Sequence, residues 1–318
     1  MKKMENSAYS RLRPENLKRV LCRPALPKDT ADVMELTRTI WDGNDYVPQV
    51  WEKWLADPDG LLAIAEYGEK VVGLAKLTRL EAQEWWLEGL RIHPEFEGRG
   101  IASHLNDYLL AYWEQHCQGV IRLATGSHRL KVHHLCERNG FQRVAEFAPF
   151  SAPIMEPFSP DEQVTIFRPL QETEIQEALK FIQPNPLTGR AAGLMNLGWQ
   201  WAQPSARFLL QTIQRDRAWW WRGKTGLLLV AEDDEDQQTP IPVIQLIACP
   251  FEKLGGFLLD YQRLMAFLGY TKTSWVAPLS AELQETLSAA GFYRDWELSI
   301  YIYEKTHPDG YDIIPSQI

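Results

Sequence analysis

The residues of this chain whose types and spacing best suit chemistry lie in E-G-L-R-I-H-P-E-F-E-G-R-G-I-A-S, residues 88–103. The apolar run at its start is typical of a strand, Pro94 breaks it, and the segment from Ile101 has the apolar spacing of a helix. The first turn of a helix offers unpaired backbone N–H groups and the positive end of the helix dipole, which attract a phosphate. Gly98 and Gly100 would let the backbone approach that phosphate closely. The stretch therefore predicts a phosphate-binding turn.

Glu97 is an acidic residue inside this expected anion site. We expect the backbone N–H of residue 97 to face the phosphate, while its carboxylate points to solvent or caps the helix, where the dipole favours it. A carboxylate about 6 Å from a phosphate costs on the order of 1 to 3 kcal/mol before salt screening. Arg99 could offset most of this cost, so Glu97 should weaken binding only modestly.

Apolar periodicity places this turn inside an alternating series of strands and helices. Strands are expected at residues 19–25, 61–67, 70–77, 84–93, 119–125 and 141–147. Helices are expected at residues 28–40, 46–56, 101–113 and 132–139. The order β-α-α-β-β-β-α-β-α-β predicts a sheet flanked by helices.

The series begins again after the proline-rich tract P-F-S-A-P-I-M-E-P-F-S-P. V-T-I-F-R-P-L resembles the first strand, V-L-C-R-P-A-L, and S-A-E-L-Q-E-T-L-S-A-A-G-F matches H-H-L-C-E-R-N-G-F. We therefore expect a tandem repeat, with domains at residues 19–150 and 164–306 and a linker at 151–163. Where the first half has E-G-R-G-I-A, the second has only F-E-K-L-G-G-F. The second copy is therefore expected to be degenerate and to serve structure or shape a binding pocket.

Composition narrows the class of protein. A chain of 318 residues is long enough for two cores, and 45% hydrophobic and 24% charged residues are ordinary for a globular protein. The formal net charge of −9 argues against general binding to nucleic acid or to an anionic membrane. No stretch approaches the roughly 20 apolar residues that span a bilayer, and the first residues lack the apolar core of a signal peptide, so a cytoplasmic location is expected. The cysteines are scattered without metal-ligand spacing, so neither a disulfide nor a metal site is expected; they are Cys22, Cys117, Cys136 and Cys249.

These residues resemble the GCN5-related N-acetyltransferase (GNAT) family, whose phosphate-binding pattern is Gln/Arg-x-x-Gly-x-Gly/Ala after a strand ending in V-x-P. Here E-G-R-G-I-A follows I-H-P, and L-C-E-R-N-G-F stands where the family has a run like L-Y-E-K-L-G-F. The match covers residues 19–150 and departs from the pattern at Glu97. It implies an α/β (α+β) fold of two tandem GNAT-like domains, each a mixed, mostly antiparallel sheet flanked by helices. It also implies an acyltransferase with acetyl-CoA as co-substrate and no metal.

The resemblance assigns the coenzyme contacts. In this family the strand before the turn splays from its neighbour, and the gap admits the pantetheine arm as an added strand. Gly89 is expected to form a bulge there, or alternatively to serve close packing, and an N–H freed near Leu90 or Arg91 could polarise the thioester carbonyl. The expected contacts are Leu90, Arg91, Ile92, Glu97, Gly98, Arg99, Gly100, Ile101, Ala102 and Ser103.

A carboxylate is the expected base, because a protonated amine cannot attack a thioester. Alternation along the strand puts Glu84, Trp86, Glu88, Leu90 and Ile92 on one face. Glu88 is the first choice, because an unpaired carboxylate in so apolar a run would be costly to bury. Glu84 is the second choice, with a solvated strand end as its alternative.

The proton donor for the departing thiolate is a tyrosine in most of the family, and Cys136 stands at that position. A thiol could donate the proton, or its small size could admit a water. The alternatives are a core cysteine, or a role for one of His133 and His134, which cannot both face the site.

The segment W-D-G-N-D-Y-V-P-Q-V-W-E-K-W-L-A-D-P-D-G lies where this fold places its acceptor-binding helices. With the strands that follow, it is similar to the histidine N-acetyltransferase group of vertebrates over about residues 40–105. That similarity implies acetylation of the α-amine of a free amino acid, with histidine as one possibility. Asp45 or Asp42 could meet the amine, and Arg91 could hold a carboxylate.

An aromatic patch of Tyr46, Trp51 and Trp54 could stack on an imidazole. The alternative for the two tryptophans, which are three residues apart on a helix, is that they anchor the core.

Other functions stay open at this point. The acceptor could be a polyamine, a thiol precursor or an aminoglycoside, and acidic pocket residues would favour such polycations. A non-catalytic acyl-CoA sensor is the alternative outside the enzymes, with Cys136 in place of tyrosine as its mark. The expected partner is a small-molecule amine, without nucleic acid or membrane, for a monomer or a homodimer.

Overall fold

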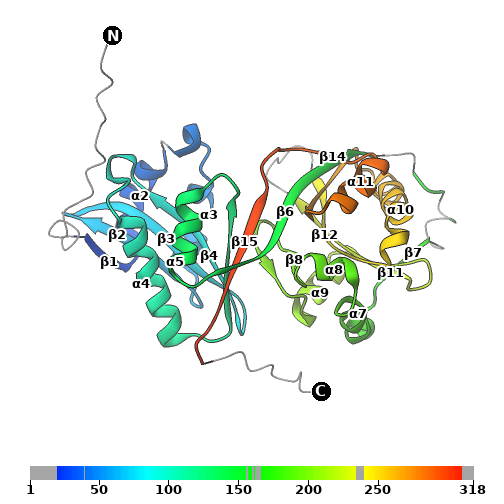
Figure 1. The fold of residues 1–318 in the computed structure, drawn as a ribbon, viewed down its shortest axis with the longest axis horizontal. Coiled ribbons are helices and arrows are strands. Elements are labelled where there is room, and N and C mark those ends of the chain that lie inside the picture. Colours follow the sequence, from blue (N-terminus) through cyan, green and yellow to red (C-terminus); the bar gives the residue numbers. More distant parts are fainter. Residues whose placement is uncertain are drawn as a thin grey trace, which may run out of the picture. The chain divides into compact units, whose positions relative to one another are not determined.

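The structure is a computed structural model that describes residues 20–38, 40–154, 157–159, 161, 166–233 and 240–309, without the side chains of residues 41 and 42. The chain forms two compact units (Figure 1). The first unit comprises Met1–Leu123, Glu137–Phe141 and Glu304–Ile318, and the second comprises Ala124–Cys136 and Gln142–Tyr303. Each unit therefore draws on separate stretches of sequence.

The sheet of the first unit has the order β1-β2-β3-β4-β5, followed by the last residues of β15 (Ile300–Thr306). The strands are β1 (Val20–Pro24), β2 (Leu61–Tyr67), β3 (Lys70–Glu81), β4 (Glu84–Ile92) and β5 (Val120–Gly126). Strands β1 to β4 pair antiparallel, and β4 pairs parallel with β5.

Helices pack on this sheet through apolar side chains. Helices α2 (Thr30–Thr37) and α3 (Val47–Leu55) share a buried cluster with β2 and β3 that includes Val33, Trp51 and Ile64. Helix α4 (Ile101–His116) also packs on β2 and β3 and buries Ile101, Leu105 and Leu109. Short 3-10 turns lie at Pro27–Asp29, Ile40–Gly43 and Pro94–Phe96, and helix α5 spans Leu130–Arg138.

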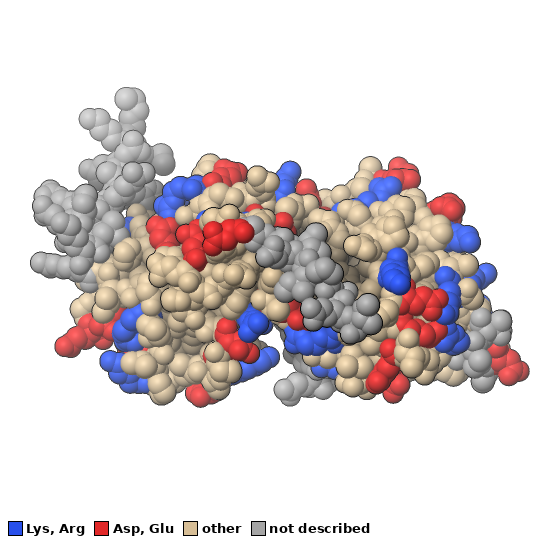
Figure 2. Space-filling model, turned by 90° about the horizontal axis from the view of Figure 1, so that it is seen from below, with Lys and Arg blue, Asp and Glu red and all other residues tan. Residues whose placement is uncertain are grey.

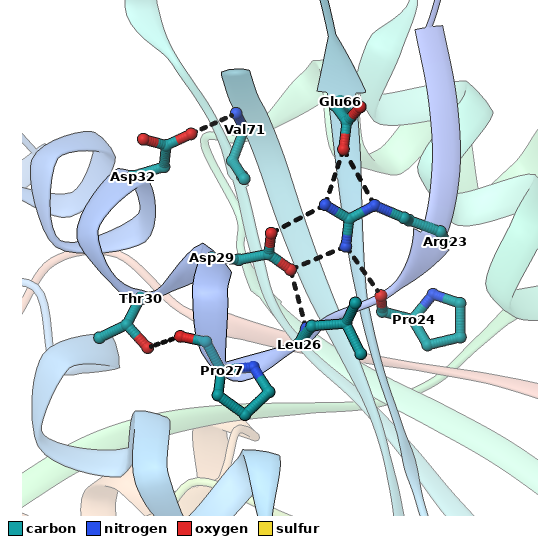
Figure 3. Close-up of polar contacts among 9 residues, drawn as sticks. All are labelled: Arg23, Pro24, Leu26, Pro27, Asp29, Thr30, Asp32, Glu66 and Val71. Atoms are coloured by element: carbon teal, nitrogen blue, oxygen red, sulfur yellow. Dashed lines mark hydrogen bonds and ion pairs between the residues drawn. The ribbon is translucent and has the colours of Figure 1, made fainter. Parts of the chain in front are cut away.

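A polar network ties the start of α2 to the sheet (Figure 3). Arg23 of β1 donates hydrogen bonds of 2.8 Å to both carboxylate oxygens of Asp29 and of 2.9 and 2.6 Å to Glu66 of β2. Asp32 accepts the backbone N–H of Val71 on β3 at 3.0 Å. The Arg23 hydrogen bonds hold the pKa of Asp29 below its usual value, although burial opposes them.

The sheet of the second unit has the order β15-β6-β13-β12-β11-β10-β7, and β14 also pairs with β6. Its other strands are β6 (Gln142–Pro153), β7 (Phe167–Pro169), β10 (Ala218–Trp221), β11 (Gly226–Asp233), β12 (Ile241–Ala248), β13 (Lys272–Pro278) and β14 (Tyr293–Arg294). Its helices are α7 (Ile175–Ile182), α8 (Pro186–Arg190), α9 (Ala206–Ile213), α10 (Leu254–Phe267) and α11 (Ala281–Ala289), with 3-10 turns at Glu172–Glu174 and Phe251–Lys253. A small hairpin joins β8 (Met195–Asn196) and β9 (Trp201–Ala202). Strands β12 and β13 pair parallel, whereas β7 with β10, β10 with β11, β11 with β12 and β6 with β13 pair antiparallel.

The expected strands and helices of the first half are confirmed, as is the mixed, mostly antiparallel sheet flanked by helices. Differences lie at the ends and in the second half. Strand β6 runs to Pro153 and so includes the first residues of the expected linker, and residues 155, 156, 160 and 162–165 of that region lie outside the described residues. Helices α8 and α9 and strands β8, β9, β13, β14 and β15 were not predicted.

Basic and acidic side chains are interspersed on the face drawn in Figure 2, without a broad field of one sign. Within the described ranges, no helix is both long and apolar enough to cross a membrane.

Candidate functional site

Strands β4 and β5 separate along their length. The parallel pairing joins only Glu84–Trp86 to Val120–Arg122, although β4 continues to Ile92 and β5 to Gly126. The later residues of β4 therefore have no β5 partner in the described sheet. Backbone groups on that side are positioned to pair with an extended ligand in the manner of an added strand.

Arg122 lies at the end where β4 and β5 still pair, and its side chain joins neighbouring strands there. Its guanidinium donates to Glu84 of β4 at 2.7 Å and to Glu304 of β15 at 2.6 Å, and Glu84 and Arg122 are both buried. Glu84 was the second choice for the base. Because its carboxylate is an interior partner of Arg122, the structure gives it a role in joining the strands and does not support that choice.

A bulge interrupts β4 just beyond this point. Glu88 and Arg91 pair with residues of β3 that are only two positions apart, so Gly89 and Leu90 together oppose one residue. Gly89 has φ +66°, in the left-handed region that favours glycine. The expected bulge at Gly89 is confirmed. It changes the expected alternation, because Arg91 now shares a face with Glu88 and Leu90 does not.

Glu88, the first choice for the base, is half-buried and accepts a hydrogen bond of 2.5 Å from Thr78 Oγ1 on β3. The negative charge of this carboxylate acts on the hydroxyl of Tyr46. Burial first, with the charges of Glu88 and Asp45 adding to it and Arg91 opposing it, raises the pKa of Tyr46 to about 12. Tyr46 therefore stays neutral beside Glu88 at any physiological pH.

Arg91 and Asp45 form a buried ion pair, with two hydrogen bonds of 2.9 Å. Arg91 Nη1 also donates to the carbonyl of Leu90 at 3.2 Å, and its guanidinium lies 5.2 Å from the ring centre of Tyr46. Asp45 was expected to meet the amine of the acceptor, and the Arg91 side chain its carboxylate. Each side chain is instead the partner of the other, which corrects both expectations. The side chain of Asp42 lies outside the description.

The tryptophans of α3 have different surroundings. Trp51 is fully buried in the core and donates from Nε1 to Thr30 Oγ1 at 3.0 Å, so the structure contradicts its expected contact with substrate. Trp54 meets Tyr46 edge to face at 6.0 Å and packs against the backbone of Gly89. Tyr46 is thus the expected aromatic contact that lies beside Glu88 and Arg91.

The turn before α4 has the expected backbone. Gly98 and Gly100 are left-handed, with φ +71° and +86°, and no side chain caps the helix at Gly100. The first-turn amides of α4, at Ile101, Ala102 and Ser103, are therefore not covered by a capping side chain. The backbone conformation of the turn agrees with the prediction, and these amides stay the expected contacts for a phosphate.

The two charged residues of the turn differ in their contacts. The Glu97 side chain is exposed, but its backbone N–H donates to the Pro94 carbonyl at 3.2 Å rather than being reserved for a ligand, and it does not cap α4. The Arg99 guanidinium stacks over Phe96 at 5.0 Å. Arg99 is therefore held at the turn by an aromatic ring and keeps a charge there that suits a phosphate.

Cys136, the expected proton donor, is buried in α5. His133 is also buried and bonds through Nε2 to the Gly126 carbonyl at 3.1 Å, whereas His134 is exposed. The two histidines therefore face different surroundings, as adjacent helical residues must.

The second unit has its own splayed pair. Strands β12 and β13 pair only at Val243 and Ile244. Residues of α8 and of the β8–β9 hairpin line the space beside them and leave a cavity of about 20 Å³, room for about one water molecule. Lys253, before α10, is right-handed where Gly100 is left-handed. Side chains of this unit therefore occupy most of the space beside its own splayed pair.

Sequence reasoning missed two features beside Glu88. Thr78 is one of them, and alternation along β3 could have placed it on this face. The other is the fully buried Lys76, cross-strand partner of Glu88, whose ammonium donates to Asp57 in the turn after α3. A lysine in an apolar run, K-V-V-G-L-A-K-L, was the available signal.

Comparisons with known proteins agree with this arrangement. Residues 30–141 match the family model described as Acetyltransferase (GNAT) family. The chain is 29% identical over 123 residues, or 36% of its length, to the human "Probable N-acetyltransferase 16", and covers 33% of that protein. It is 32% identical over 82 residues, or 26% of its length, to "Histidine N-acetyltransferase" of Oreochromis niloticus, and covers 24% of it. The chain thus matches a third or less of the length of these curated relatives.

A solved structure extends the likeness to both units. The "Tandem GNAT protein from the clavulanic acid biosynthesis pathway" superimposes with a TM-score of 0.56 at 11% identity, over 90% of this chain and 98% of that one. At such low identity the likeness concerns the fold alone.

Proposed function

We propose, from the match of residues 30–141 to the acetyltransferase (GNAT) family model, that the chain transfers the acetyl group of acetyl-CoA to the primary amine of a small molecule. The α-amine of a free amino acid such as histidine is the first candidate. The observation that carries the proposal is the half-buried carboxylate of Glu88, placed directly before a backbone bulge on the open side of a splayed strand pair.

The residues of the first unit fit the coenzyme. The left-handed glycines 98 and 100 and the uncapped start of α4 suit a pyrophosphate, with Arg99 as an added positive charge. The backbone of Leu90, Arg91 and Ile92 suits the pantetheine arm. When bound, acetyl-CoA supplies the activated acetyl group. Glu97 contributes through its place in the turn and not through its own N–H.

Glu88 would take the proton of the acceptor ammonium, so that the amine can attack. The hydrogen bond from Thr78 orients the carboxylate, and the neutral Tyr46 beside it adds no competing charge. Backbone N–H groups at the bulge would face the oxygen on which negative charge develops. Cys136 stays our candidate for returning a proton to the leaving thiolate.

Two observations support histidine as the acceptor: the names of the relatives, and the aromatic side chain of Tyr46. The relatives named histidine N-acetyltransferase match 87 and 82 residues of this chain. Tyr46 offers a ring edge and a hydroxyl near Glu88. Because Arg91 is bound to Asp45, a group other than the Arg91 side chain would have to hold an α-carboxylate.

The second unit would then be a structural partner. Its splayed pair is filled by its own chain, and its helix α10 lacks a left-handed glycine before the first turn. We keep the assignment of catalysis to residues 19–150 and of a supporting role to residues 164–306, with the closing strand β15 contributing Glu304 to Arg122.

The test measures coenzyme A release from acetyl-CoA with L-histidine, other amino acids, polyamines, thiol precursors and aminoglycosides as acceptors. Glu88→Gln should lower kcat by about 10²- to 10⁴-fold with its preferred acceptor and leave acetyl-CoA binding intact. Glu95→Gln, an exposed carboxylate seven residues on, is the matched control and should keep activity. Coenzyme binding without turnover for any amine would favour the sensor instead.

A further inference from the structure

We propose that Trp54 is a positioning residue, whose indole holds the β4 bulge in the shape that the transfer requires. The inference rests on the proposed function. It concerns a residue that the sequence offered only as a stacking or core aromatic. Its basis is the close approach of the Trp54 ring to the backbone of Gly89.

The contact is direct. A β-carbon with ideal geometry on Gly89 would lie 2.6 Å from Cη2 and 2.8 Å from Cζ3 of Trp54, so the indole occupies the space that any side chain there would need. Trp54 itself is buried, at 7% exposure. Glycine adopts this left-handed conformation without steric cost, so the indole does not relieve strain there; by filling the space against the Gly89 backbone it restricts how that backbone can move.

The second bulge residue is held from the same direction. Arg91 Nη1 binds the carbonyl of Leu90, and Asp45, at the start of α3, fixes Arg91. Tyr46 lies under the guanidinium of Arg91 and meets Trp54 edge to face. The segment from Asp45 to Trp54 thus contacts Gly89 directly, and it reaches Leu90 only through Arg91.

This geometry matters for rate because peptide planes of the bulge carry the N–H groups that would meet the developing oxyanion. Such donors act only when they are aimed before the reaction, within about 0.5 Å of the productive position. Fixing the Leu90 carbonyl also fixes the direction of the N–H in the same peptide plane. Loss of the indole should therefore lower the rate of the chemical step more than it weakens coenzyme binding.

The test compares Trp54→Phe with Trp51→Phe, a buried tryptophan on the same helix that instead bonds to Thr30. We expect kcat of Trp54→Phe to fall about tenfold or more, with the KM and Kd for acetyl-CoA within about twofold of the wild-type values. Trp51→Phe should lower Tm yet keep kcat per folded molecule. Equal kcat losses in the two variants, or an unchanged kcat in Trp54→Phe, would overturn the proposal.

A second readout does not need turnover. In ¹⁵N spectra of the full chain, the backbone amide signals of Leu90 and Arg91 should shift in Trp54→Phe and stay in place in Trp51→Phe. The reverse pattern refutes the positioning role. Trp54→Tyr is measured in parallel, so that a folding defect of one variant does not decide the result. An inactive wild type would refute the proposed function, while these amide signals still decide whether Trp54 shapes the bulge.

Discussion

Arg91 donates from Nε and Nη2 to the two carboxylate oxygens of Asp45, each at 2.9 Å, with both side chains at least nine-tenths buried. One partner lies on β4 and the other immediately before α3. The pair therefore joins the bulged strand to the segment that leads into the helix carrying Trp54.

Removing one charge of this pair should strongly destabilise the folded protein. Asp45→Asn leaves Arg91 buried without its counter-ion, and we expect a loss of about 3 to 5 kcal/mol in the free energy of unfolding, measured by urea titration. Asp45→Asn combined with Arg91→Met should recover part of that loss, because the buried charge is then gone. A double variant that is as unstable as the sum of the single variants would contradict an interior ion pair.

Gly100→Ala should weaken coenzyme binding specifically. Gly100 has φ +86°, so alanine costs about 1 to 2 kcal/mol of backbone strain at the phosphate turn and places a methyl group against the ligand. We expect Kd for acetyl-CoA, measured by calorimetry, to rise about tenfold or more. The control is Gly140→Ala, at φ +79° with nothing within 4 Å of the added methyl group. Gly140→Ala should carry a similar backbone strain and keep the wild-type affinity for acetyl-CoA. Equal losses of affinity in the two variants would argue against this turn as the phosphate site.

Local sequence patterns were enough to predict most helices and strands of the first unit. The strand–turn–helix around Gly98 and Gly100 follows from residues close in sequence, so both the elements and the glycine conformations agree with expectation. The bulge at Gly89 could also be predicted from the sequence. Its consequence, that Arg91 lies on the same face of the strand as Glu88, could not be predicted, because simple alternation puts the two side chains on opposite faces.

Pairing between distant residues was the part that the sequence could not supply. Asp45 and Arg91 are 46 positions apart, and Arg122 and Glu304 are 182 apart. Asp45 and Arg91 were candidate contacts for the substrate until the fold showed that they bind each other. The same holds for Trp51, since a helical tryptophan near a site cannot be told from a core anchor before burial is known.

Gly60→Ala should destabilise the first unit through the Lys76–Asp57 pair. An added methyl group would overlap Lys76 Nζ and the Leu77 carbonyl oxygen, and that backbone oxygen cannot easily move. We expect a loss of about 1 to 3 kcal/mol in the free energy of unfolding. Gly68→Ala, where nothing lies within 4 Å of the new methyl group, carries only backbone strain at φ +53°. A loss no larger than that of Gly68→Ala would refute the crowding around the ammonium.

Asp29→Asn should remove part of the acid sensitivity of folding. Hydrogen bonds from Arg23, opposed by burial, hold the pKa of Asp29 below its unfolded value of about 3.9. A carboxyl whose pKa is depressed by folding adds stability above the unfolded pKa and loses it as the pH falls through the folded pKa. The wild type should therefore exceed Asp29→Asn by about 2 kcal/mol at pH 7, and the gap should shrink below about pH 4. Urea titrations across that range measure the gap. A gap that stays constant down to pH 3 would mean that Arg23 does not stabilise the ionised carboxylate, since protonation would then cost the wild type nothing that the amide variant keeps.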